Sequence, residues 1–172
     1  MRRAQGRVLA AAVLAIAAAL GCRVEDSGGG GPAPEWTLPD LEGRTVALAD
    51  LRGKPVVLDF WATWCTPCEF QIPILNEVYE RYRDRVVFVG VAVDVDGREV
   101  VAPFAKERAI AYRVLLGDEE LAQRYGARGF PSLYVIGKDG NIALSHVGVI
   151  DVDDLEEALD RALAAGAKAP PG

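Results

Sequence analysis

Histidine and cysteine are scarce in this chain, and their scarcity excludes most metal sites. The 172 residues contain one histidine, His146, and three cysteines, Cys22, Cys65 and Cys68. A structural zinc site usually takes four such ligands from two close pairs, whereas here only Cys65 and Cys68 form a close pair. We therefore expect neither a metal nor a separate cofactor, and we interpret the pair as a redox-active dithiol.

The chain also lacks an excess of positive charge and an apolar segment of membrane-spanning length. Its 19 lysines and arginines are outnumbered by 25 acidic residues, which gives a net charge of −6 and no basic stripe. This balance argues against a nucleic-acid partner. The apolar run Val8–Leu20 has 13 residues, whereas a membrane-spanning helix needs about 20.

The first 22 residues predict an export signal that is separate from the folded domain. Arg2, Arg3 and Arg7 precede the apolar run, and Cys22 follows it. This segment resembles the lipobox of bacterial lipoproteins, in which the cysteine carries the lipid. Ordinary signal cleavage that leaves Cys22 free is the alternative. In either case we expect an exported protein. A lipid would anchor it to the cell membrane or outer membrane, facing the periplasm or the exterior.

Composition divides the remaining residues into three parts. Residues 23–34 are rich in glycine and proline and predict a flexible linker. Residues 35–164 are enough for one domain with a substantial core and too few for two. Residues 165–172 show no periodic apolar pattern, so we expect a disordered tail.

The hydrophobic pattern of the domain predicts an α/β fold. Continuous or alternating apolar runs indicate strands, and apolar residues spaced three to four apart indicate helices. The expected strands are 35–38, 45–48, 56–61, 86–93, 114–116, 132–136 and 142–149, and the expected helices are 67–83, 98–108, 119–125 and 151–164. Asp151 is a plausible N-cap of the last helix. This order predicts a mixed sheet with helices on both faces and a short β extension at its N-terminal end.

Cys65 and Cys68 lie at the turn between a predicted strand and a predicted helix. A disulfide between them closes a loop of only four residues and would stabilise by roughly 2 kcal/mol, so chemistry explains the pair better than stability does. A helix start carries partial positive charge and free N–H groups, so the pKa of Cys65 should lie below the free value of about 8.5. Cys68, one turn further in, should be more buried and should resolve the mixed disulfide that Cys65 forms.

The residues around the pair resemble the active site of the thioredoxin superfamily. The segment 60–68, Phe-Trp-Ala-Thr-Trp-Cys-Thr-Pro-Cys, is close to its signature. Segments 36–43 and 48–55 are similar to the N-terminal extension of the TlpA/ResA-like branch of membrane-tethered oxidoreductases, and 129–132 is similar to its cis-proline loop. The resemblance covers residues 35–164 and implies a thioredoxin-like fold.

The resemblance also implies an activity and partners. The expected enzyme is a protein-disulfide reductase that acts on exported proteins through Cys65 and Cys68. Apocytochrome c before haem attachment is one expected substrate class, and a general reductase is the alternative. A membrane thiol carrier would have to supply electrons, because the outside compartment is oxidising.

Four further residues receive roles from the same resemblance. Asp59 matches the buried acid through which thioredoxins exchange a proton with the inner cysteine, although many TlpA-like proteins have asparagine there. An acid at a strand edge bonded to backbone is the alternative. Pro131 matches the cis proline. Phe130 before it and Trp64 beside the nucleophile are expected to form the substrate-docking surface, with simple packing as the alternative for Trp64.

The other polar residues near these motifs receive no catalytic role. Asp94, Asp96 and Glu99 follow the predicted strand 86–93, where some family members place an active-site glutamate. None of the three aligns clearly with that residue, so we interpret them as loop and helix-start acids. His146 has no partner histidine and is interpreted as a surface residue.

Two other kinds of protein remain as alternatives. Peroxiredoxins share this fold, but their nucleophile usually follows a threonine by three residues and a proline by seven. Those places here hold Ala62 and Leu58. A copper-delivery or thiol-binding module usually has a wider cysteine spacing and a suitably placed histidine. Turnover of hydrogen peroxide and titration with copper would distinguish these alternatives from a reductase.

Overall fold

A mixed five-stranded sheet lies at the centre of the computed structural model, which describes residues 30–165 of the chain. Its strands in spatial order are β5 (Arg113–Leu116), β4 (Val87–Ala92), β3 (Val56–Trp61), β6 (Ser132–Ile136) and β7 (Ile142–Val147). β3, β4 and β5 are parallel, whereas β6 is antiparallel to β3 and β7 is antiparallel to β6. Every residue of β3 is buried, as expected for a continuous apolar run that is covered on both faces.

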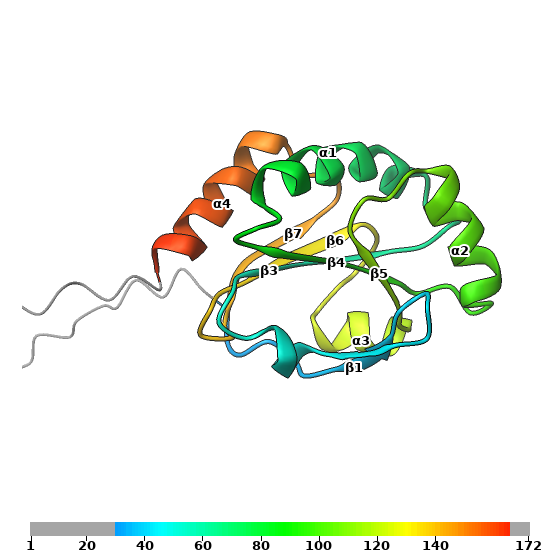
Figure 1. Cartoon of the computed structure of the whole chain (residues 1–172), viewed down its shortest axis with the longest axis horizontal. Helices are drawn as coiled ribbons and strands as arrows, with labels where there is room; N and C mark the ends of the chain where they lie inside the picture. Colours follow the sequence, from blue (N-terminus) through cyan, green and yellow to red (C-terminus); the bar gives the residue numbers. More distant parts are fainter. Residues whose placement is uncertain (1–29, 166–172) are drawn as a thin grey trace, which may run out of the picture.

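Helices cover both faces of this sheet, which confirms the predicted fold class (Figure 1). They are α1 (Thr66–Tyr82), α2 (Arg98–Glu107), α3 (Glu119–Arg124) and α4 (Val152–Ala164). The strands β3, β4 and β5 follow one another in a single direction across the sheet, so right-handed crossovers place α1 and α2 on the same face. α4 packs beside α1, and α3 lies on the opposite face with the N-terminal strands (Figure 1).

Each face of the sheet contributes its own part of the core. Alternate residues of β3 point to opposite faces. Val57 packs under α1 and α4 with Leu75 and Leu155. Phe60 points the other way and packs against Tyr125, with ring centroids 5.3 Å apart. Fully burying an aliphatic or phenylalanine side chain contributes about 1.5–3 kcal/mol relative to leaving it exposed, so these two layers hold β3 firmly in place.

A small antiparallel sheet precedes the central one. β1 (Thr37–Pro39) pairs with β2 (Thr45–Ala47), and a short 3-10 helix, η1 (Leu48–Leu51), follows. Asp40, directly after β1, forms an isolated bridge with Leu115 of β5. The predicted β extension is therefore present and is attached to the edge of the central sheet.

The residues before β1 differ from the prediction of a flexible linker as far as residue 34. The Ala33 N–H donates to the carbonyl of Gly140 at 3.0 Å, and the Ile142 N–H donates to the carbonyl of Gly31 at 3.1 Å. Ala33 is also buried. Because these backbone groups pair with the β6–β7 hairpin, residues 31–33 are part of the folded domain.

The other terminal predictions fall mostly outside the part of the chain that the structure describes. The export signal with Cys22 and the first part of the linker precede residue 30, and the predicted tail follows Ala165, which is the C-cap residue of α4. Between residues 30 and 165, no helix combines the length and apolar character needed to cross a membrane.

The predicted element boundaries hold to within two residues, and the differences have local causes. The strand expected over 142–149 ends at Val147, because Gly148 has a φ of +96° and its N–H bonds to the Pro131 carbonyl. Asp151 stands at the N-cap of α4 as predicted, but its side chain makes no capping hydrogen bond. The first helix continues through Pro73.

Candidate active site

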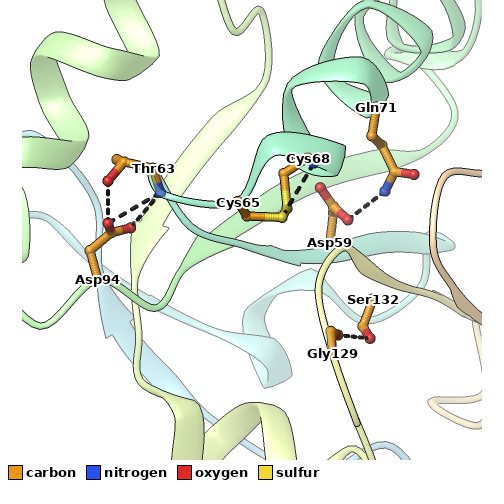
Figure 2. Close-up of a disulfide and its surroundings, with 8 residues drawn as sticks. All are labelled: Asp59, Thr63, Cys65, Cys68, Gln71, Asp94, Gly129 and Ser132. Carbon is orange, nitrogen blue, oxygen red and sulfur yellow. Dashed lines mark hydrogen bonds between the residues drawn. A yellow bond between two sulfur atoms is a disulfide. The ribbon is translucent and has the colours of Figure 1, made fainter.

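The two cysteines form a disulfide at the start of α1 (Figure 2). Cys65 is the N-cap residue, and its sulfur accepts a hydrogen bond from the Cys68 N–H at 3.3 Å. Pro67 stands in the first turn, where its missing N–H costs no hydrogen bond. Both residues are buried, and Cys68 at 1% exposure is more buried than Cys65 at 5%, as predicted. The helix start can therefore stabilise negative charge on the outer sulfur.

The turn that leads into α1 is held by a buried carboxylate. Asp94, which follows β4, accepts two bonds of 3.1 Å from the Thr63 N–H and a third bond from the Thr63 hydroxyl (Figure 2). The Asp94 side chain is buried. Asp94 was expected only to be a loop acid, and this contact was not predicted. The one available signal was its position directly after a strand parallel to β3.

Asp59 lies beneath the disulfide in the middle of the central sheet. It is 2% exposed and accepts a hydrogen bond of 2.7 Å from Gln71 Nε2 on α1. Figure 2 shows its carboxyl between Cys68 and Gln71. Because β3 lies between β4 and β6 and the partner is a side chain, the alternative of a backbone-bonded acid at a strand edge is wrong.

Burial gives Asp59 unusual acid–base properties. The loss of hydration raises the pKa of Asp59 from 3.8 to about 8, although the hydrogen bond from Gln71 opposes part of that rise. A carboxyl with a pKa in this range can both hold and release a proton near neutral pH. Gln71, which bonds Asp59, lies one turn after Cys68 on α1, so the carboxyl lies under the same face of the helix as Cys68.

Gln71 is the residue of this site that sequence reasoning missed. It is fully buried, and its Oε1 accepts the Ile150 N–H at 3.1 Å. A signal was present, because Gln71 is a polar residue four and seven positions before the apolar Leu75 and Val78, a spacing that places all three on one helix face. It also lies three residues after Cys68, a spacing that places two side chains on one face of a helix.

An aromatic pair lies beside the disulfide. Trp64 is 62% exposed, and its ring makes an edge-to-face contact with Phe130 at a centroid distance of 5.9 Å. The peptide bond between Phe130 and Pro131 is cis, as predicted. Simple packing does not describe Trp64, whereas Trp61 is buried and stacks on Phe104 of α2. The exposed Trp64 ring, with the partly buried Phe130 beside it, is available to contact a substrate.

The remaining histidine lies outside this arrangement. His146 is on β7, and its Nε2 is 3.2 Å from the Val149 carbonyl. Among residues 30–165, no three histidine, cysteine or acidic side chains are grouped so that they could hold a metal ion.

Comparison with known proteins places these features among thiol-exchange proteins. The profile described as the AhpC/TSA family matches residues 30–145. The thiol-disulfide oxidoreductase ResA of Bacillus thuringiensis subsp. konkukian is 35% identical over 134 residues, which are 77% of each chain. The thioredoxin-like protein YneN of Bacillus subtilis is 31% identical over 76% of this chain and 78% of its own length.

Solved structures agree with these sequence relatives. The thioredoxin domain of a thiol-disulfide oxidoreductase from Bacteroides vulgatus has a TM-score of 0.71 and 26% identity, covering 78% of this chain and 97% of that domain. A thiol:disulfide interchange protein of the thioredoxin family from Chlorobium tepidum has a TM-score of 0.69 and 29% identity, with the same two coverages of 78% and 97%.

Proposed function

Because the chain belongs to the AhpC/TSA family and is a thioredoxin-like thiol–disulfide oxidoreductase similar to ResA, we propose that it reduces disulfides in exported proteins. The observation that carries this proposal is the disulfide at the start of α1 with a buried acid beneath it. Cys65 is the nucleophile, Cys68 is the resolving thiol and Asp59 is the proton acceptor.

The reaction proceeds in two exchange steps. The Cys65 thiolate attacks a substrate disulfide, which forms a mixed disulfide and releases one substrate thiolate that takes up a proton. Cys68 then loses its proton to the Asp59 carboxylate and attacks the Cys65 sulfur. This step forms the disulfide between Cys65 and Cys68 and releases the second substrate sulfur as a thiolate, which takes up a proton from water. The substrate gains two electrons and the enzyme loses two.

The residues around the pair support reduction rather than oxidation. Thr66 and Pro67, between the cysteines, supply no positive charge that would strongly stabilise a thiolate. Where Asp59 is ionised, above its pKa of about 8, its negative charge opposes a thiolate further. We expect a potential near the value of about −270 mV for thioredoxin rather than near the value of about −120 mV for DsbA. Equilibration with a dithiothreitol redox buffer measures it, and a value near that of DsbA would reverse the proposed direction.

Trapping of mixed disulfides tests the two cysteine roles and identifies the substrates. Cys68→Ser should accumulate mixed disulfides with exported proteins, because the second step cannot occur. Cys65→Ser should accumulate none, and it is the matched control. Trapping by Cys65→Ser alone would reverse the two roles. We propose apocytochrome c as one class of trapped protein and a membrane thiol carrier as the electron donor.

A peroxidase remains the second candidate function, because the chain belongs to the AhpC/TSA family and peroxiredoxins share its fold. The places where peroxiredoxins usually have threonine and proline hold Ala62 and Leu58, and both are fully buried apolar residues. Reduced protein should therefore consume hydrogen peroxide no faster than a small free thiol at the same concentration. Rapid catalytic turnover would favour the peroxidase. Tight copper binding by the reduced protein would favour the delivery module.

The proposed location follows from the sequence that precedes the described residues. We propose that Cys22 is lipidated and that the protein is anchored to the cell membrane or outer membrane, facing the periplasm or the exterior. One acyl chain binds a membrane only marginally, so a stable anchor needs several. Cys22→Ser should leave the protein soluble or unprocessed. A processed Cys22→Ser protein that stays in the membrane fraction would contradict the lipid anchor.

A further inference from the structure

Gln71 connects the buried acid to the backbone at Ile150, which lies just before α4 on the same face of the sheet as α1. Its Nε2 donates to Asp59 Oδ1 at 2.7 Å, and its Oε1 accepts the Ile150 N–H at 3.1 Å. The side chain is fully buried and both groups at its end are used. A buried amide with two partners of this kind has one allowed orientation.

The orientation of the amide determines where the Asp59 proton can lie. A backbone N–H can only donate, so the oxygen of the Gln71 amide must face Ile150 and its NH₂ group must face Asp59. Asp59 Oδ1 therefore accepts a hydrogen bond whether or not the carboxyl is ionised. A proton on Asp59 must occupy Oδ2.

We propose that Gln71 is a positioning residue for the proton transfer between Cys68 and Asp59, acting by holding Oδ1 as an acceptor and leaving Oδ2 for the proton. This inference rests on the proposed role of Asp59 as the proton acceptor. Cys68 and Gln71 are three residues apart on α1 and share the face above Asp59 (Figure 2). The Cys68 thiol and the Gln71 amide therefore face the Asp59 carboxyl from the same rigid helix.

The amide also sets the pH range over which the acid works. Its hydrogen bond favours the ionised carboxyl and lowers the pKa of Asp59, whereas burial, the larger cause, raises it. Without the amide the pKa should rise further, so less carboxylate is available at neutral pH. The resolving step would then need a higher pH.

Few other titratable groups face Asp59 from the elements around it. Besides the two cysteines, the buried Tyr112 ahead of β5 interacts with Asp59. Burial raises the pKa of Tyr112 well above 10 and the negative charge of Asp59 adds to that rise, so Tyr112 stays neutral. On α1, Glu69 is partly exposed and paired with Arg108. The acidic residues at the start of α4 are exposed: Asp151, Asp153 and Asp154.

The same amide joins the acid to the loop beside the cis proline. Ile150 lies two residues after Gly148, whose N–H donates to the Pro131 carbonyl at 2.9 Å. A change at Gln71 should therefore also be visible in the backbone at Ile150. Amide hydrogen exchange at Ile150 reports this contact separately from the chemistry.

The test compares Gln71→Met, which removes both hydrogen bonds but keeps an apolar side chain of similar length, with the parent protein. The rate of the resolving step is measured by stopped flow in single-turnover reduction of a model disulfide from pH 6 to 10. A hydrogen bond to a charged group is strong enough to move the midpoint of the pH profile up by about one pH unit, which lowers the rate at pH 7 about tenfold. Gln123→Met, an exposed substitution on α3, is the matched control and should leave the profile unchanged.

A second background shows whether Gln71 acts through Asp59. In Asp59→Asn, adding Gln71→Met should cause no further shift of the pH profile, because no carboxyl remains to be positioned. Gln71→Glu keeps an acceptor for the Ile150 N–H, and its carboxyl would share a proton with Asp59, so it should give a profile with two steps. It also serves as the test if Gln71→Met does not fold.

Several results would overturn the inference. An unchanged pH profile in folded Gln71→Met, or a single-step profile at the parent's midpoint in Gln71→Glu, would show that the amide has no part in the proton transfer. An equal shift in the presence and absence of the Asp59 carboxyl would show that Gln71 acts only on structure. Failure of the proposed function is distinct, because the parent protein itself would then reduce no disulfide.

Discussion

Asp59 should make the oxidised protein less stable as the pH rises through the neutral range. Burial raises the pKa of Asp59 from 3.8 to about 8 in the folded protein. Between these two values the residue is neutral when folded and ionised when unfolded, so unfolding releases a proton. The stability that neutral Asp59 contributes is fully present below the unfolded pKa and is lost as the pH rises through the folded pKa.

The size of the effect follows from the number of protons released. Between about pH 4 and pH 8 the free energy of unfolding should fall by about 1.4 kcal/mol per pH unit because of this one group. From pH 5 to pH 7 the loss is about 2.7 kcal/mol. Asp59→Asn cannot ionise and should gain that amount relative to the parent over the same interval. Other titrating groups are common to both proteins and cancel in the difference.

Urea unfolding at pH 5, 6 and 7, followed by circular dichroism with the disulfide intact, measures this difference. Asp50→Asn is the matched control, because it makes the same substitution at an exposed position in η1. Its stability should follow that of the parent at each pH. If the stabilities of the parent and Asp59→Asn also fall in parallel, the buried carboxyl is ionised in the folded protein, and both its pKa of about 8 and its proposed proton role lose their basis.

Three further substitutions test the surroundings of the site. Asp94→Ala should cost about 1–3 kcal/mol in urea unfolding and slow disulfide reduction, because Thr63 loses a charged acceptor; unchanged stability would refute the anchoring role. Trp64→Ala should raise KM for a protein disulfide severalfold while stability changes by less than about 0.5 kcal/mol, and a large loss of stability would instead indicate a packing role. Gly90→Ala should cost about 1–3 kcal/mol, because a Cβ there would lie 2.8 Å from Trp61 Nε1, and an unchanged Tm would contradict that close contact.

The strands and helices could be predicted from the sequence because their signals are local. The continuous apolar run 56–61 indicated a strand buried on both faces, and it is the central strand of the sheet. The four helices were indicated by apolar residues at helical spacing. Their ends moved by only one residue, since helix termini are the least constrained part of that pattern.

The parts of the site that were missed depend on contacts between distant residues. Gln71 bonds to Ile150 across 79 positions, and Thr63 bonds to Asp94 across 31. Contacts between residues so far apart along the chain leave no periodic signal in the sequence. The end of the linker was missed for a related reason, because its composition indicates flexibility while its backbone groups pair with the hairpin near residue 140.

The pairing of residues 31–33 with the β6–β7 hairpin determines the end of the domain at which the chain enters it. The hairpin lies beside the start of β3, whereas Cys65 follows the end of β3. The two points are separated by the length of a six-residue strand, about 20 Å. Whatever is joined to the N-terminal side of this domain is therefore attached at one pole while the thiol chemistry takes place at the other. An attachment surface at the first pole leaves the second open to incoming proteins.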